Sequence, residues 1–378
     1  MKPCRWKNLA LIVTIAAGLL SSGLPVFPCS TFLLRSGGIL LVGHNLDEQD
    51  HIPGLVFINK RNVAKTALSW AWLLSGKTDK TPPLAWTSKY ASLTFNPYGR
   101  EFPDDGLNEA GLFIGEMTLR ETRYPFDPAK PRLFMSLWMQ HLLDTCRTVE
   151  QVVESASALN IDGWGWHFFA ADRSGQAASV EFVEGKIVVH RGDTLPVPVL
   201  GNSLYEEEMV RLAEYSGFGG DKPISMEDMS APRFVQAALL LRAYRPALKP
   251  PVDYCFDILR QMGRGTTRWS LVCDLKSVRA FFRTDKAGGI KSVRLGDFDP
   301  GCDQPARFLD IHAGLAGDVR REFEEYSREA NRAHVRQAWE AMLKIAPAFE
   351  WLLKMNKSTR DEAVERFASY PEQTRCRK

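Results

Sequence analysis

Charge of one sign does not accumulate along this sequence. The chain has 378 residues, of which 25% are charged, and its formal net charge is only +3 at pH 7. It contains no polybasic block, so the sequence predicts neither nucleic acid nor an anionic membrane surface as a partner. No low-complexity linker and no repeat of fixed period divides it. Its hydrophobic content of 45% is that of an ordinary globular protein.

Several common catalytic arrangements are also missing. The sequence has no Gly-x-Ser-x-Gly elbow, no Walker loop and no His-Glu-x-x-His zinc motif. Its cysteines beyond residue 28 do not show the short paired spacings of a zinc site. The histidines are scattered without metal-ligand spacing, and we interpret them as structural or surface residues: His44, His141, His167 and His190. We therefore predict no metal ion and no organic cofactor.

The first 28 residues differ from the rest of the chain. Lys2, Arg5 and Lys7 precede an uncharged, mostly apolar run from Leu9 to Leu20, and small residues follow at 21–23. This order is typical of an export signal, and the apolar run is shorter than the roughly 17–25 residues of a membrane-spanning helix. We predict cleavage after residue 23 and then removal of a short propeptide, with periplasmic or secreted localisation. An uncleaved membrane anchor is the alternative.

Removal of that propeptide makes Cys29 the first residue. Its thiol then lies on the same residue as a free α-amino group, whose unperturbed pKa of about 7.7–8.0 suits a general base. This is the arrangement of an N-terminal nucleophile hydrolase, in which the thiolate attacks. Two alternatives stay open, a Cys29–histidine pair and a disulfide that includes Cys29. The later cysteines can also form a disulfide, but their positions do not identify the pair.

Alternating apolar residues and hairpin-length turns predict antiparallel sheets with helices outside, an α+β layered fold. Asp47 follows a predicted hairpin and can return beside Cys29, although a loop acid that caps a turn is the simpler interpretation. We predict a helix that Ser230 caps, a charged helical region over 319–355 and a surface tail after it. Other predicted elements are strands at 31–34, 39–42, 164–171, 178–183, 186–190, 269–274, 277–283 and 291–297, a tight turn into a buried strand over 106–118, and helices at 132–146 and 148–159.

Several motifs in one order resemble the choloylglycine hydrolase family of cysteine-type N-terminal nucleophile amidases, which includes penicillin V acylases and bile salt hydrolases. The motifs are Cys29-Ser30-Thr31-Phe32, Gly43-His44-Asn45-Leu46-Asp47, Trp86-Thr87-Ser88-Lys89-Tyr90, Gly106-Leu107-Asn108-Glu109-Ala110-Gly111-Leu112, Leu200-Gly201-Asn202-Ser203, Ser230-Ala231-Pro232-Arg233-Phe234 and, more weakly, 267–274. The resemblance implies a four-layer αββα sandwich over 29–315 with a C-terminal helical extension at 316–378. It also implies hydrolysis of linear, non-peptide C–N amide bonds, and it suggests a homotetramer.

The resemblance also implies roles for individual residues. Cys29 is the nucleophile, Asp47 orients its amine or thiol, and Asn202 donates to the oxyanion. Arg233 lies near the thiolate and favours its ionisation.

This chain departs from the family pattern at two positions. His44 stands where many members have arginine, and Thr118, two residues after Glu116, stands where many have a second oxyanion asparagine. These changes favour an acyl amide with an apolar acyl group over bile salts. We expect aromatic residues around 70–86 and Phe113 to line the acyl pocket.

Two rival functions stay open at this point. An acyltransferase can use the same acyl-enzyme with an amine as acceptor. A non-catalytic exported or anchored binding protein requires no free thiol at the N-terminus.

Overall fold

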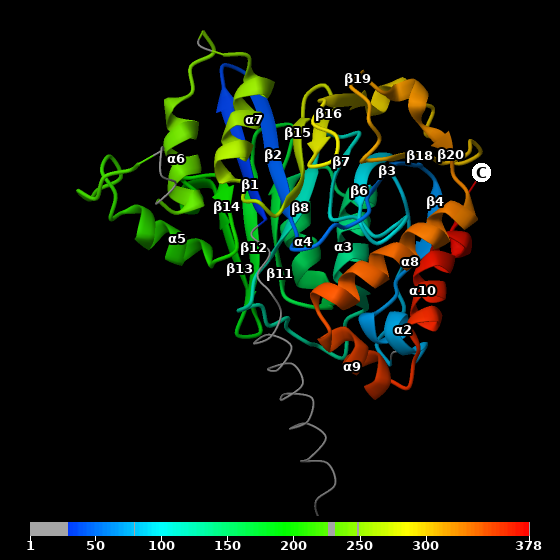
Figure 1. Ribbon diagram of the computed structural model, residues 1–378. Coiled ribbons are helices and arrows are strands. Elements are labelled where there is room, and N and C mark those ends of the chain that lie inside the picture. Colours follow the sequence, from blue (N-terminus) through cyan, green and yellow to red (C-terminus); the bar gives the residue numbers. More distant parts are fainter. Residues whose placement is uncertain (1–28, 79, 226–230, 248, 378) are drawn as a thin grey trace, which may run out of the picture.

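A computed structural model describes residues 29–78, 80–225, 231–247 and 249–377, so the predicted signal, propeptide and Ser230 lie outside the described residues. Two large, mainly antiparallel sheets dominate these ranges (Figure 1). The first sheet has the strand order β14 (Val199–Leu200), β1 (Ser30–Ser36), β2 (Ile39–Asp47), β15 (Thr267–Asp274), β16 (Arg279–Thr284), β17 (Lys291–Arg294) and β19 (Gly317–Asp318).

The second sheet has more strands and carries the other half of the central core. Its strand order is β13 (Lys186–Arg191), β12 (Ala177–Val183), β11 (Trp166–Ala171), β8 (Phe113–Thr118), β7 (Asp105–Asn108), β6 (Ser92–Asn96), β3 (Leu55–Asn59), β18 (Arg307–Asp310) and β20 (Glu324–Glu325). The two sheets pack through apolar side chains such as Phe95 and Phe282, whose rings lie 5.3 Å apart. Strand β1 is buried along most of its length because it lies between the other sheet and the outer helices.

Helices cover the outer face of each sheet (Figure 1). The helices on the first sheet's side are α5 (Tyr205–Leu212), α6 (Arg233–Ala243) and α7 (Pro251–Met262). Those on the second sheet's side are α2 (Trp70–Ser75), α3 (Met135–Thr145), α4 (Val149–Ala158), α8 (Arg328–Ile345), α9 (Ala348–Met355) and α10 (Arg360–Ser369). The layers are therefore helix, sheet, sheet, helix, which confirms the predicted αββα sandwich.

The sequence motif at 106–112 forms the tight turn between β7 and β8. Asn108 Oδ1 accepts hydrogen bonds from the backbone N–H groups of Ala110 and Leu112. Gly111 has a φ of 85°, and an added Cβ would lie 2.4 Å from the carbonyl oxygen of Leu275. Only glycine fits there. The turn delivers Glu116 and Thr118 to the end of β8, as the sequence predicts.

Two predicted elements begin at different residues from those expected. Residues 132–134 form β9 (Arg132–Phe134) instead of the first turn of α3, because they pair with β10 (Asn160–Asp162). Helix α6 begins at Arg233, and its N-cap residue is Pro232. Arg233 is therefore the first residue of the helix, next to the preceding loop.

The prediction of a surface tail is wrong. Helix α10 buries Ala363, Val364 and Phe367 against α8 and α2. The chain then ends in β21 (Arg375–Cys376), which extends a small sheet formed by β4 (Val63–Thr66) and β5 (Ala85–Thr87). A disulfide joins Cys302 to Cys376. The C-terminal segment is therefore an integral part of the second core.

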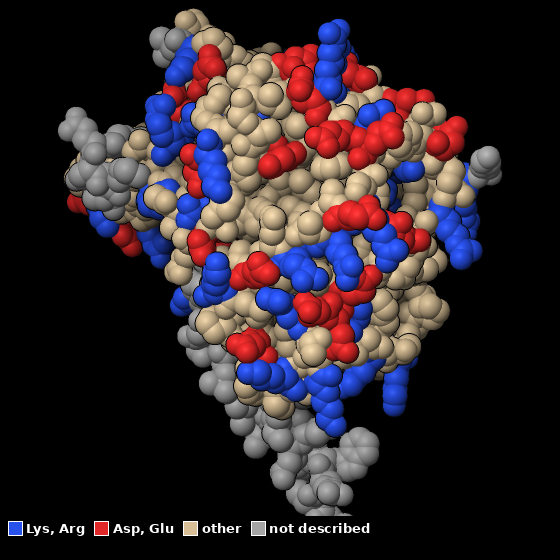
Figure 2. Space-filling view, turned by 45° about the vertical axis from the view of Figure 1, so that its right-hand side comes forward, with Lys and Arg blue, Asp and Glu red and all other residues tan. Residues whose placement is uncertain are grey.

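On the face that carries α8 and α10, basic and acidic side chains are interspersed, and a tract without charged residues lies between them (Figure 2). Ion pairs link α10 to α8: Arg328–Glu365, Arg332–Glu365, Arg336–Asp361 and Arg360–Glu340. None of the helices in the described ranges combines the length and the apolar character that a membrane span requires.

Candidate active site

Cys29 lies immediately before β1 and is only 2% exposed. Its Sγ is 4.0 Å from the backbone oxygen of Asp47, because the β1–β2 hairpin pairs Ser30 with Asn45 and so brings the end of β2 back to the start of β1. Cys29 is a free cysteine. The alternative in which it forms half of a disulfide is therefore wrong.

A chain of polar contacts links the other predicted site residues. Asp47 is fully buried, accepts a short hydrogen bond from the Thr267 hydroxyl, and lies 3.4 Å from Nη1 of Arg233. Arg233 Nη2 donates to Oδ1 of Asn202 at 3.0 Å. Asn202 Nδ2 in turn donates to the backbone oxygen of Thr118 at 2.9 Å. Five residues from distant parts of the sequence are thus linked near the cysteine.

The position of Asn202 follows from the sheet register. Strand β14 pairs antiparallel with β1 and places Leu200 opposite Thr31. The chain that leaves β14 therefore runs past Cys29. Contacts at both ends of the Asn202 amide hold its orientation. Such a preorganised donor is what stabilises a developing oxyanion.

Four acids near the cysteine were not predicted as a group. They are Glu48, which is partly buried, and Asp104, Asp105 and Glu116, which are almost fully buried. Burial raises the pKa values of Glu48 and Glu116 well above the usual range, and the neighbouring Asp104 charge raises them further. The sequence signal for Asp104 and Asp105 was a turn-rich segment, which does not predict that they face a catalytic residue.

His44 lies among these acids and is fully buried. Its Nδ1 is 2.7 Å from the Thr31 hydroxyl, and its Nε2 is 3.7 Å from Asp104 and 3.9 Å from Asp105. Its ring therefore bridges β1 and the acids. It does not line the pocket that contains Cys29.

The same acids affect the nucleophile. Burial raises the pKa of the Cys29 thiol well above its usual range, and the charges of Glu116 and Asp104 raise it further. The expected lowering of the thiol pKa by Arg233 is therefore not the dominant effect. A thiol in this setting needs a base beside it before it can attack.

Cys29 opens onto a largely apolar pocket. Its polar lining residues besides Cys29 are Glu48, Asp104, Glu116 and Thr118, together with the Tyr98 hydroxyl. Its apolar wall is supplied by Leu46, Ile52, Trp164, Trp166, Met342, Ile345, Ala346 and Phe349. The C-terminal helices α8 and α9 and the connection between them thus contribute directly to the pocket.

The predicted aromatic lining is wrong. Trp70 packs against Phe134 and Trp164 in the second core, and Phe113 is buried beside His44. The pocket uses Trp164 and Trp166 instead. The tryptophan content of the sequence was a useful signal, but periodicity alone did not distinguish core from pocket.

A second network lies behind Asn202. His167 contacts Oε1 of Glu181 at 3.1 Å through Nδ1 and the backbone oxygen of Gly201 at 2.8 Å through Nε2. Glu181 also accepts from the backbone N–H of Tyr205 at 3.0 Å and lies 3.6 Å from His190. These contacts fix the segment that carries Asn202. His167 and His190 therefore have a positioning role that scattered histidines did not predict.

The contacts of Glu181 should make the free energy of unfolding depend on pH in the acid range. Burial alone would raise the pKa of Glu181, but the hydrogen bonds from His167 and His190 lower it to about 2. A carboxyl whose folded-state pKa lies below its unfolded value of 4.5 stabilises the protein above that value. We expect Glu181→Gln to lower the free energy of unfolding by about 3 kcal/mol at neutral pH. The difference from wild type should shrink as the pH falls from 4.5 towards 2.

Denaturant unfolding at several pH values measures this effect. Glu150→Gln is the matched control, because Glu150 pairs with Arg191 at the exposed surface and should change stability little at any pH. A Glu181→Gln penalty that is the same at pH 3 and pH 7 would contradict the assignment.

The two-sheet sandwich, with a buried cysteine just before its first strand, defines the architecture of N-terminal nucleophile hydrolases. Residues 89–241 match the family model described as linear amide C-N hydrolases, choloylglycine hydrolase family. A penicillin V acylase from Pectobacterium atrosepticum is 25% identical over 245 residues. That match covers 53% of this chain and 65% of the relative, so the chain spans somewhat less than two thirds of it.

Solved structures agree on the fold. A penicillin V acylase from Agrobacterium tumefaciens matches with a TM-score of 0.69 at 22% identity, over 79% of this chain and 98% of the other. A variant of conjugated bile acid hydrolase from Clostridium perfringens matches with a TM-score of 0.62 at 18% identity, over 76% and 98%. The chain is thus similar to choloylglycine hydrolase family proteins over residues 89–241 and shares their fold. The matched region includes Asn202 and Arg233 but begins after Cys29 and Asp47.

Proposed function

We propose that the protein hydrolyses linear C–N amide bonds of small acyl amides, in the manner of a penicillin V acylase, through an acyl-enzyme on Cys29. The observation that carries this proposal is that Cys29 opens onto an apolar pocket and lies beside the linked residues Asp47, Arg233 and Asn202. The match of residues 89–241 to a family model of linear amide C-N hydrolases supports the same reaction.

The reaction proceeds in two halves. The α-amino group of Cys29 takes the thiol proton, and the thiolate forms a bond to the amide carbonyl carbon. The side-chain amide of Asn202 donates to the oxyanion. The C–N bond then breaks as the proton passes to the leaving amine. In the second half, water attacks the thioester, the acid leaves, and the thiol regains its proton.

The raised thiol pKa supports the need for a free α-amine. Burial and neighbouring acids oppose a thiolate at this position. A base on the same residue removes the proton at the site of attack, and its positive charge then offsets the acids. We therefore propose that export and two-step removal of residues 1–28 precede activity. A homotetramer stays a prediction, which light scattering of the mature protein tests.

The pocket indicates the substrate class. Its aromatic and aliphatic wall suits an apolar, preferably aromatic, acyl group. We therefore propose aryl-acyl amides such as penicillin V as better substrates than conjugated bile acids. Release of the free acid from each, at equal concentrations, tests this order, and faster hydrolysis of the bile acid conjugates would reverse it.

Phe349 provides the most specific test of the acyl pocket. It lies on α9, is 5% exposed, and packs edge-on against Trp164 with ring centroids 5.4 Å apart. We expect Phe349→Ala to lower kcat/KM for an aryl-acyl amide about 10–200-fold more than for the matching acetyl amide, since the acetyl group does not reach the lost contact.

Trp351→Ala is the matched control, because Trp351 lies on the same helix but is 44% exposed and does not line the pocket. It should leave both kcat/KM values close to wild type. Thermal midpoints show that each variant is folded. Equal losses for the aryl and acetyl amides would contradict the proposed acyl pocket.

We expect the ionisation of Asp47 to set the acid limb of the pH profile of kcat/KM. Burial raises the pKa of the Asp47 carboxyl to about 6, although the Thr267 hydrogen bond and the Arg233 charge lower it. Only the ionised carboxylate attracts a protonated α-amine, so we expect kcat/KM to fall as the pH drops below about 6. Thr267→Val removes a contact that lowers the Asp47 pKa. This variant should therefore move the acid limb to higher pH.

Ser270→Ala serves as the control for this experiment, because Ser270 is on the same strand β15 but bonds to Asn45 instead of Asp47. Its acid limb should coincide with that of wild type. An acid limb in Thr267→Val that is unchanged, or that moves to lower pH, would show that Asp47 does not control it.

A further inference from the structure

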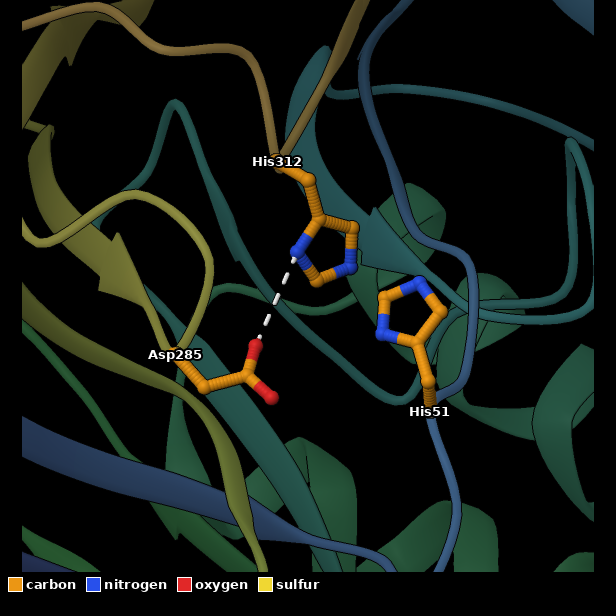
Figure 3. A group of neighbouring side chains, drawn as sticks. All are labelled: His51, Asp285 and His312. Carbon is orange, nitrogen blue, oxygen red and sulfur yellow. Dashed lines mark ion pairs between the residues drawn. The ribbon is translucent and has the colours of Figure 1, made fainter.

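A second cluster of potential ligands lies outside the catalytic pocket. His51, Asp285 and His312 come from three separate loops, which follow β2, β16 and β18 (Figure 3). One ligand atom from each residue lies within 4.8 Å of the other two. The ring centroids of the histidines are 4.7 Å apart, and His312 Nδ1 lies 4.0 Å from Oδ1 of Asp285.

The hydrogen bonds of His312 leave one ring nitrogen free. Its Nε2 lies 3.1 Å from the backbone oxygen of Ile52 and donates to it. Nδ1 is then the unprotonated nitrogen, and it is buried without a hydrogen-bond donor. A histidine whose second N–H donates to a backbone carbonyl is the usual arrangement of a metal ligand, since that bond fixes both the tautomer and the ring orientation.

His51 shows the same unsatisfied nitrogen. Its Nδ1 is buried without a hydrogen-bond partner. Figure 3 shows one nitrogen of its ring turned towards His312 and Asp285. Two buried ring nitrogens without hydrogen-bond partners in one place cost free energy, and an ion bound by both of them removes that cost.

Asp285 can provide the third ligand, because its contact with Arg268 uses only one of its two carboxylate oxygens. Arg268 lies 3.1 Å from its Oδ2 and is itself held by three backbone oxygens, those of Glu48, Gln49 and Asp50. Oδ1 is therefore free to face the histidines. Asp285 is 28% exposed in its side chain, so an ion can enter from solvent.

We propose that His51, Asp285 and His312 bind a divalent transition-metal ion such as Zn²⁺, with water in the remaining position. Two imidazoles and a carboxylate are ligands that suit Zn²⁺, which binds nitrogen at about 2.0–2.1 Å and oxygen at about 2.0–2.2 Å. Small side-chain rotations bring the three ligand atoms to these distances. The inference does not depend on the proposed amide hydrolysis.

The ion joins loops at the edge of the catalytic pocket. His51 is next to Ile52, whose side chain lines the pocket with Cys29, and the same loop carries Glu48. Binding to the folded protein alone stabilises it. We therefore expect Zn²⁺ to raise the thermal midpoint of the protein and to hold this loop in place.

Titration of metal-free protein with ZnCl₂, in competition with a chromophoric chelator, tests the site. The background is Cys29→Ser, so that the active-site thiol cannot bind the ion. We expect one Zn²⁺ per chain, and loss of this site in His51→Ala and in His312→Ala. His141→Ala is the control, because His141 packs against Trp86 elsewhere on the chain and should bind as the parent does.

Asp285→Asn keeps the proposal testable if a histidine variant fails to fold. It preserves the shape of an exposed side chain and should weaken Zn²⁺ binding at least about tenfold, whereas Asp50→Asn, beside His51, should not. Zn²⁺ should raise the thermal midpoint of the parent but not that of His312→Ala. No binding by the parent, or binding that persists in both Asp285→Asn and His312→Ala, overturns the proposal.

Discussion

Cys29→Ser is expected to lower kcat for an aryl-acyl amide by at least about a thousandfold while the protein stays folded. The hydroxyl is a far weaker nucleophile than the thiolate, and the site provides an amine of modest basicity to activate it. The loss should appear in kcat and kcat/KM together, since the pocket that binds the acyl group is unchanged. Steady-state hydrolysis of penicillin V provides the measurement.

Cys146→Ser is the matched control for this change. Cys146 is also a buried free cysteine, but it belongs to the second core and lies outside the pocket. Its substitution should leave kcat close to that of the wild type, whatever its effect on the thermal midpoint. Hydrolysis by Cys29→Ser at a rate near that of Cys146→Ser would remove Cys29 from the mechanism.

Asn202→Ala is expected to lower kcat about 10²–10³-fold, the usual cost of removing one oxyanion donor. The contacts from Arg233 and to Thr118 hold the amide so that it needs little reorganisation when the oxyanion forms. KM should change less than kcat, because the interaction strengthens only in the transition state.

Ser203→Ala controls for local disturbance of the same loop, since Ser203 is the next residue and does not line the pocket. Its kcat should stay within about twofold of wild type. If Asn202→Ala retains most of the wild-type kcat, the oxyanion is held by another group. The Thr118 hydroxyl is then the next candidate, and Thr118→Val compared with Thr118→Ser tests it.

The parts of the site that follow local rules could be predicted from the sequence. A hairpin must return Asp47 towards Cys29, and a Gly111 turn must start β8 and deliver Thr118. Long-range register could not be predicted in this way. The pairing of Leu200 with Thr31 places Asn202 at the site, and only the resemblance to a family indicated its role.

Burial explains what the sequence did not reveal. Asp104 and Asp105 have the composition of a turn, yet β7 carries Asp105 into the space between the sheets. The charged pattern of 360–369 suggested a solvated tail, but its apolar residues lie on one side and pack against α8 and α2. Likewise, Phe349 belongs to a charged helical region and still forms a pocket wall.

The central claim is that Cys29 acts as an N-terminal nucleophile, and intact mass of the purified, active protein tests it most directly. The measurement is made on the same sample whose hydrolysis of penicillin V is recorded. The account predicts a chain that begins at Cys29, with activity in proportion to the fraction of that species. A chain that retains residues before Cys29 and hydrolyses the amide at the full rate would contradict it.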